Sequence, residues 1–166
     1  LLQFFIIFSY LIDGFAYAAE SLSGKFIGAN NKPDLVKSIK YLFYWGLSIA
    51  VVFTITYILW NGFLISLLTD NVSILKAIEP YKFWIILVPL ITFSSFLWDG
   101  IFIGATASVP MRNTMLVSTI LVFIPSVFIF FPLFHNHGLW LAMMLFMTIR
   151  GLLMTFFSKK YIFSKL

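Results

Sequence analysis

The amino-acid sequence predicts an all-α membrane protein with five transmembrane helices. Of its 166 residues, 61% are hydrophobic and only 10% are charged, whereas a soluble globular domain is about 45–50% apolar and about 25% charged. The 21 Phe and 5 Trp residues suit lipid-facing surfaces and interfacial anchors. Because Cys is absent, the composition excludes disulfides, thiolate zinc sites and cysteine nucleophiles.

Five segments are long and apolar enough to cross a bilayer, since a spanning helix needs about 20 mostly apolar residues. Turn-forming residues separate them at 30–34, 69–71, 79–80, 108–110 and 135–138. Pro33 and Asp34 should also open a short basic helix at the membrane surface. We expect spans at 1–27, 41–68, 83–107, 113–131 and 138–158, which together form one transmembrane region at 1–158, and a cytoplasmic tail at 159–166.

The distribution of basic residues predicts the orientation. With five alternating spans, eight Lys and Arg residues fall on one side and two on the other, and Arg150 lies within the last span. Cytoplasmic loops are enriched in Lys and Arg, so we expect a multi-pass protein of the plasma (inner) membrane with a cytoplasmic C-terminus. These charges lie in loops and not along a binding stripe, which argues against a nucleic-acid partner. The chain opens at Leu1 inside an apolar segment, so we expect it to be the C-terminal part of a longer protein.

Two aspartates, Asp13 and Asp99, interrupt apolar spans, and each is followed by glycine. The helical rise of about 1.5 Å per residue puts both near the middle of a hydrocarbon core about 30 Å thick, on helices that run in the same direction. Glu20 follows Asp13 on a similar face, among small residues that favour contact with protein or a cavity. Acids at such a depth usually mark an ion, proton or substrate path. We therefore predict that Asp99, Asp13 and Glu20 couple transport to a cation or proton.

A structural role is the alternative for these acids. Neighbouring hydroxyl groups or an arginine would then satisfy each carboxylate; Thr92, Ser94 and Ser95 are the hydroxyl candidates near Asp99. Arg150 is long enough to reach the interface or to pair with Glu20, Asp13 or Asp99. We expect such a pair to neutralise charge and not to take part directly in transport.

Two prolines lie within predicted spans. Pro89 and Pro125 each remove a backbone hydrogen bond and are predicted to kink their helices. The kinks are either fixed features of helix shape or hinges for alternating access.

The sequence gives no support for an enzyme or for a metal site. It lacks a Gly-rich phosphate loop, a G-x-S-x-G motif and an H-E-x-x-H motif. His135 and His137 form an H-x-H in a loop, but two histidines without a third ligand are better interpreted as exposed loop residues. We expect no cofactor.

Two longer motifs resemble the multidrug and toxic-compound extrusion (MATE) family, most closely its DNA-damage-inducible protein F branch. The first is IDGFAYAAESLSGKFIGA at 12–29. The second is WDGIFIGAT at 98–106, followed by MRNTM at 111–115. With the order of the spans, the resemblance covers essentially the whole chain.

The resemblance implies a twelve-helix transporter with two six-helix lobes around a central cleft. This chain would supply five helices of the C-terminal lobe, and its partners would be the missing N-terminal lobe, a small-molecule substrate and the bilayer. The family exports cationic or amphiphilic compounds in exchange for H⁺ or Na⁺. Asp99 resembles a position where Na⁺-coupled relatives place a cation-site acid, whereas Asp13 and Glu20 match the motif of the branch. The fragment alone is not expected to transport.

Two other functions fit parts of the pattern. A flippase for a polyprenyl-linked glycan precursor belongs to the wider superfamily, but such proteins tend to line the cleft with basic residues, and the deep charges here are mainly acidic. A membrane scaffold or assembly subunit would not transport at all.

Overall fold

The computed structural model describes residues 1–68 and 71–165, so Thr69 and Asp70 of the second predicted connector and Leu166 of the predicted tail lie outside the described residues. The described residues are overwhelmingly helical, and five segments are long and apolar enough to cross a membrane. The predicted fold class is therefore confirmed. These segments are Leu2–Gly28, Lys32–Ser66, Val72–Gly104, Ser108–Phe134 and Asn136–Tyr161.

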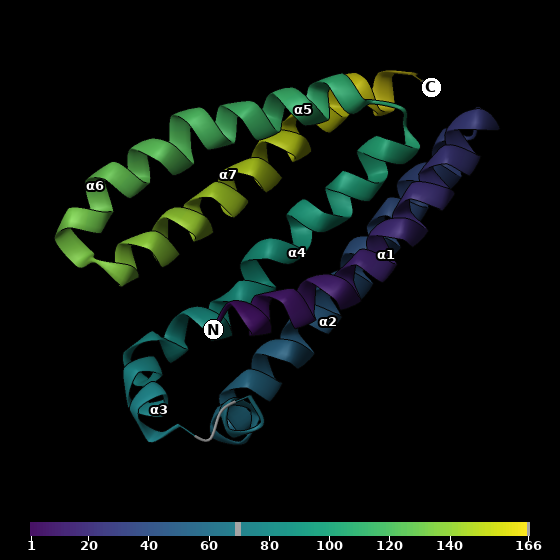
Figure 1. The fold of residues 1–166 in the computed structure, drawn as a ribbon. Coiled ribbons are helices and arrows are strands. Elements are labelled where there is room, and N and C mark those ends of the chain that lie inside the picture. Colours follow the sequence, from purple (N-terminus) through teal and green to yellow (C-terminus); the bar gives the residue numbers. More distant parts are fainter. Residues whose placement is uncertain (69–70, 166) are drawn as a thin grey trace.

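The helix α4 lies at the centre of the arrangement and contacts α1, α2 and α7, while α5 and α6 run alongside α7 (Figure 1). A π-helical stretch, Ser118–Phe123, joins α5 to α6. Short 3-10 turns precede α4 at Glu79–Tyr81 and follow α7 at Phe163–Lys165. The helices are α1 (Leu2–Gly28), α2 (Lys32–Ser66), α3 (Val72–Ile78), α4 (Lys82–Gly104), α5 (Ser108–Val117), α6 (Ile124–Phe134) and α7 (Asn136–Tyr161).

The helix α2 differs from expectation, because the predicted surface helix and the second span form one helix of 35 residues. The Asn31 side chain accepts a hydrogen bond from the backbone of Asp34 and caps the first turn. Leu35, Ile39 and Leu42 are buried in the core at helical spacing, so the same apolar face continues from the basic segment into the span. The one interruption within α2 is at Trp60, whose φ of −117° and ψ of 19° mark a kink.

Two glycines bring α1 and α4 into backbone contact. A Cβ atom on Gly100 would lie 2.0 Å from the carbonyl oxygen of Ala16, and one on Gly104 would lie 2.2 Å from the carbonyl oxygen of Glu20. Both distances are far below any van der Waals contact, so only glycine fits at either position. The contacts advance together along the two helices, which therefore run parallel. This G-x-x-x-G pairing is a common way for membrane helices to approach closely.

The two prolines are accommodated differently. Pro89 is buried inside α4, which continues on both sides of it. Pro125 lies in the first turn of α6, directly after the π-helical stretch. Proline cannot donate a hydrogen bond to the carbonyl four residues earlier, here Leu121, and its ring crowds that carbonyl. The wider π-helical turn before Pro125 relieves this conflict. Whether either proline acts as a hinge stays a prediction.

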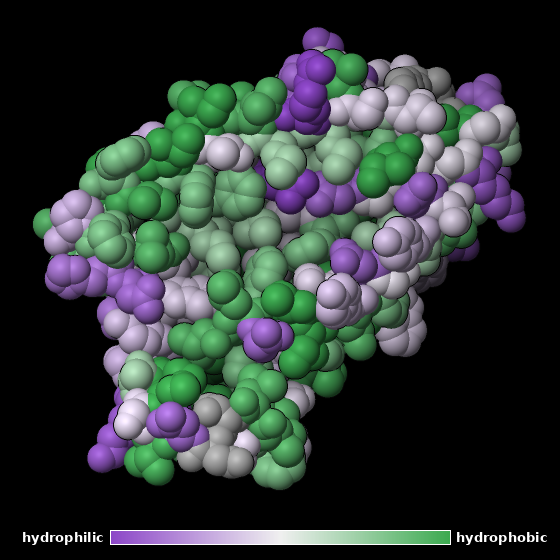
Figure 2. All heavy atoms as spheres, in the orientation of Figure 1, coloured by the Kyte–Doolittle hydropathy of each residue, from purple (hydrophilic) through white to green (hydrophobic). Residues whose placement is uncertain are grey.

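The outer surface is largely apolar along the helices. Figure 2 shows hydrophobic side chains over much of the visible face along α5 and α6, with hydrophilic residues at the edges of the molecule and also in separate patches across the middle of the face. Leu121, Phe128 and Phe156 are among the most exposed large apolar residues. Such surfaces are suited to lipid, and the five apolar segments make this a multi-pass membrane protein.

Candidate functional site

An ion pair between Asp99 of α4 and Arg150 of α7 lies within the helical bundle. The Nη2 atom of Arg150 donates to both carboxylate oxygens of Asp99, at 2.7 Å to Oδ1 and 2.8 Å to Oδ2. Arg150 is only 8% exposed, and the Asp99 side chain is 20% exposed. Of the three partners that the sequence left open for Arg150, the structure therefore pairs it with Asp99. Within a membrane, such a pair replaces two isolated charges by one dipole.

Two hydrogen bonds between α4 and α7 flank the ion pair. Ser95 Oγ donates to the backbone carbonyl of Met147 at 2.8 Å, and Trp98 Nε1 donates to Thr155 Oγ1 at 2.7 Å. Gly151 allows this approach, because a Cβ atom there would lie 3.1 Å from Ser95 Oγ. The two helices are thus fixed on both sides of the charges.

The hydroxyl groups considered as partners of Asp99 are used elsewhere. Thr92 Oγ1 donates to the carbonyl of Val88 in its own helix at 2.8 Å, and Ser95 bonds across to α7. No hydrogen bond joins Ser94 to Asp99 within the described ranges. Among the residues that the structure describes, the arginine is therefore the hydrogen-bond partner of this carboxylate.

Asp13 lies on the other side of α4 from Arg150, on α1. Because Ala16 faces Gly100, the register of the two parallel helices puts Asp13 about level with Leu97 and about 3 Å along the axis from Asp99. Within residues 1–68 and 71–165, the Asp13 carboxylate has no hydrogen bond or ion pair, although the residue is half-buried.

Glu20 stands apart from this cluster. Its backbone lies against Gly104, two helical turns beyond Asp13, or about 10 Å along the axis. Its side chain is half-buried and makes no ion pair with any residue that the structure describes. Glu20 is therefore not part of the ion pair between Asp99 and Arg150.

Arg150 also has a buried donor without an acceptor. Its Nε atom is buried and has no hydrogen-bond partner in the described part of the chain. Every hydrogen bond recorded for the guanidinium goes to Asp99. The pair is therefore well matched in charge but incompletely satisfied in hydrogen bonds.

The histidines correct one expectation. His137 was predicted to be an exposed loop residue, but it lies in the first turn of α7, half-buried, where its Nδ1 accepts a hydrogen bond of 2.9 Å from Trp84 Nε1. Its ring centre also lies 4.4 Å from that of Tyr81. His135 is exposed and connects α6 to α7 with a positive φ of 49°. A search of the described residues finds no group of three or more His, Cys, Asp or Glu side chains that could hold a metal ion.

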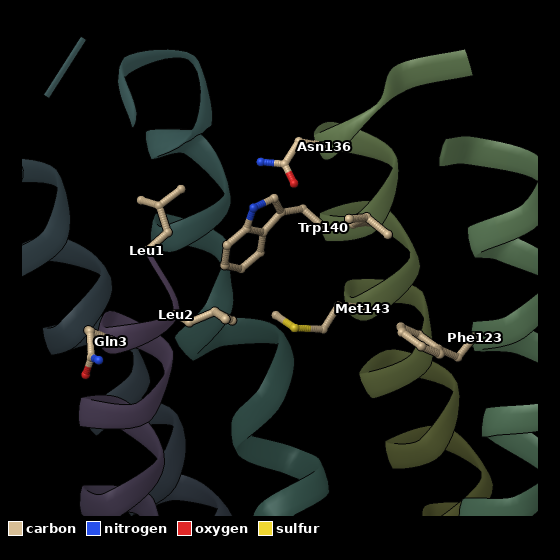
Figure 3. Close-up of a pocket in the computed structure, with 8 residues that line it drawn as sticks. Leu1, Leu2, Gln3, Phe123, Asn136, Trp140 and Met143 are labelled. Carbon is tan, nitrogen blue, oxygen red and sulfur yellow. The ribbon is translucent and has the colours of Figure 1, made fainter. Parts of the chain in front are cut away.

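An open apolar cavity of about 610 Å³ separates the start of α1 from α7 and the π-helical stretch. Figure 3 shows the Trp140 indole and the Met143 side chain extending from α7 into this space, opposite the first residues of α1. Two amide side chains, Gln3 and Asn136, provide polar groups at its wall. The other lining residues are Leu1, Leu2, Phe123 and Leu139.

The family model named MatE matches residues 1–129, which include both Asp13 and Asp99. The chain belongs to the MatE family. The resemblance drawn from the two Asp-Gly motifs is thereby confirmed. Every helix from α1 to α5, together with the first part of α6, falls within the matched MatE region.

A curated MatE-like relative is the DNA damage-inducible protein F of Escherichia coli (strain K12), which is 34% identical over 144 residues. The match covers 87% of this chain but 31% of that protein, so the chain spans about a third of the length of its relative. The comparison with solved structures gives no significant match.

Sequence reasoning missed two features of this MatE chain. The first is the role of Gly100 and Gly104, whose spacing of four is the signal that was available. The second is the bond between Trp84 and His137, which joins residues from different spans and leaves no local pattern.

Proposed function

We propose that this chain is part of a secondary active antiporter that exports cationic or amphiphilic compounds in exchange for H⁺ or Na⁺ by alternating access. The observation that supports this most directly is the ion pair of Asp99 with Arg150 inside a membrane-spanning bundle, with a second acid, Asp13, on the neighbouring helix α1. Asp13, Asp99 and Arg150 together carry a net charge of −1 when all three are ionised, so one further positive charge would balance them. Membership of the MatE family supports transport over catalysis.

The exchange follows from competition for negative charge. A proton or Na⁺ that neutralises the cluster weakens its attraction for a cationic substrate, and the substrate in turn disfavours the ion. Na⁺ is a hard cation that prefers oxygen ligands, which carboxylates supply. If the site opens to one side of the membrane at a time, the gradient of the ion drives the substrate in the opposite direction.

The proposal includes the rest of the transporter. The chain spans 31% of its curated relative, and we infer that an N-terminal lobe outside this chain provides the other wall of the cleft. We place the complete protein in the plasma (inner) membrane with the C-terminus in the cytoplasm, because eight basic residues lie on that side. The bond of 2.8 Å from Lys32 Nζ to the carbonyl of Phe163 is consistent with the start of α2 and the tail lying at the same membrane face.

Reconstitution of the full-length protein in vesicles tests the function. A cationic dye is loaded inside, and a pH gradient or a Na⁺ gradient is imposed in separate experiments. We expect dye efflux that depends on one of the two gradients, and we expect Asp99→Asn to reduce it. Efflux that is independent of both gradients, or translocation of a polyprenyl-linked glycan instead of dye, would overturn the antiporter proposal.

A further inference from the structure

We propose that a groove between α2 and α7 binds an anionic phospholipid, with its phosphate held by Lys40 and Lys159 and an acyl chain lying along the apolar floor. The groove is open and has a volume of about 570 Å³, which is within the range of about 300–1,000 Å³ that is common for small-molecule sites. This proposal does not depend on the antiport function, because it concerns how the helices contact the membrane.

The floor of the groove is aromatic. The helices α2 and α7 each pack against α4, so the surface of α4 between them forms the floor. The ring centre of Phe43 lies 6.3 Å from that of Phe93 and 5.3 Å from that of Trp98. The hydrogen bond of 2.7 Å from Trp98 Nε1 to Thr155 Oγ1 fixes the indole against α7. Such a floor suits a hydrocarbon chain and gives a free anion little to bind.

Two lysines from different helices supply the positive charge of the groove. Lys40 of α2 and Lys159 of α7 both line it, and both are exposed. Neither forms an ion pair with a residue in the described ranges, and no acidic residue of the described chain lines the groove. The two ammonium groups therefore attract a phosphate and repel a cationic compound. Their flexible stems allow both to reach the same headgroup.

The direction of the groove matches a lipid in one leaflet. Both lysines lie towards the membrane face that has the excess of Lys and Arg, whereas Leu47 lies about 10 Å deeper along α2 than Lys40. Phe163 lines the groove near that face, and Lys32 Nζ donates to its carbonyl at 2.8 Å, which holds the turn after α7 against the start of α2. Headgroup charge at the surface and an acyl chain pointing inwards reproduce this polarity. Basic pockets between membrane helices on the cytoplasmic side bind anionic headgroups in this way.

Lipid binding to the full-length protein tests the site. The protein is purified in detergent, delipidated and titrated separately with phosphatidylglycerol, with phosphatidylcholine of the same acyl chains and with inorganic phosphate. Native mass spectrometry measures the bound lipid, and the melting temperature reports stabilisation. We expect phosphatidylglycerol to bind about tenfold more tightly than phosphatidylcholine. Inorganic phosphate should not raise the melting temperature, because it cannot use the apolar floor.

Paired lysine substitutions locate the preference. Lys40→Gln with Lys159→Gln should reduce the affinity for phosphatidylglycerol to that for phosphatidylcholine. The matched control is Lys37→Gln with Lys160→Gln, which removes the same charge from the same two helices at positions that do not line the groove. The control should keep the preference. Equal losses in the two double variants would overturn the site in favour of a diffuse basic surface. Equal stabilisation by inorganic phosphate and by phosphatidylglycerol would overturn the lipid as the ligand.

A cysteine-labelling experiment tests whether another part of the full-length protein covers the groove. Leu47→Cys is introduced in a background without other cysteines, and a membrane-permeant maleimide is added to the delipidated protein. We expect labelling that phosphatidylglycerol slows. Val52→Cys is the control, since Val52 is an exposed residue of α2 that does not line the groove, and its labelling should not depend on lipid. A Leu47→Cys variant that stays unlabelled without lipid, while the control is labelled, would show that protein fills the groove and would overturn the proposal.

Discussion

Gly100 lies directly against the backbone of Ala16, so close that a Cβ atom would be 2.0 Å from the Ala16 carbonyl oxygen. This contact sets the register between α1 and α4. It therefore also sets the distance between Asp13, three residues before Ala16, and Asp99, which is adjacent to Gly100. The packing of α1 against α4 therefore also determines how these two acidic residues are placed relative to each other along the bundle.

Replacing this glycine should separate the two helices. We expect Gly100→Ala to destabilise the full-length protein by about 3 kcal/mol, because the added methyl group meets backbone that cannot rotate away. Thermal melting of the purified protein in detergent measures the change. The matched control is Gly14→Ala, since a Cβ atom there meets nothing within 4 Å. The control should be neutral or stabilising by about 0.5 kcal/mol, as expected for Gly→Ala in a helix. Equal melting temperatures for the two variants would show that the close contact is not needed.

The ion pair predicts a non-additive effect on stability. We expect Arg150→Met alone to cost about 3–5 kcal/mol, because it leaves the Asp99 carboxylate without its partner in a low-dielectric interior. Adding Asp99→Leu removes the second charge and should recover most of the loss. A double-mutant cycle on melting in detergent measures the coupling between the two sites. If the stability losses of the two single variants simply add in the double variant, the ion pair between α4 and α7 contributes no coupling energy to the stability of the folded protein.

Much of the fold could be predicted from the sequence because apolar length is a strong local signal. Five spans and the parallel direction of the helices with Asp13 and Asp99 both follow from it. The partner of Arg150 could not be predicted in this way. Periodicity shows which face of a helix is apolar, but it does not show which helices are neighbours. Three acids were within reach of Arg150 by length alone, and the contact between α4 and α7 selects Asp99.

The shape of α2 shows a different limit. Asn31, Pro33 and Asp34 correctly predict a helix start, but the end of the basic segment has no breaker. Buried Leu35 and Ile39 extend the apolar face through it, so one helix forms where charge alone predicts two pieces. The kink at Trp60 could not be predicted either, because the residue there is neither proline nor glycine.

The bond between Trp84 and His137 predicts a local contribution to stability at the junction of α4 and α7. We expect His137→Leu to cost about 1–2 kcal/mol, because the Trp84 N–H group loses its acceptor in a half-buried position. His135→Asn is the control, since His135 is exposed and asparagine tolerates positive φ. Melting temperature and the tryptophan fluorescence of the full-length protein measure both variants. If the two variants have the same melting temperature, the hydrogen bond makes no measurable net contribution to the stability of the folded protein.

Substitution of Pro125 tests whether this proline only shapes its helix or also acts as a hinge during transport. Pro125→Ala restores an N–H donor for the Leu121 carbonyl, so the π-helical stretch at Ser118–Phe123 should convert to regular α-helix. We expect the protein to be stabilised by about 1 kcal/mol or more. If Pro125 is a hinge, the same variant should slow gradient-driven dye efflux, because helix bending is then opposed by an additional backbone hydrogen bond. Initial efflux rates and melting temperatures are compared with those of Pro89→Ala, which changes a proline buried inside α4. A more stable protein with an unchanged efflux rate would assign Pro125 to helix shape alone, since a hinge cannot be stiffened without an effect on the motion that it permits.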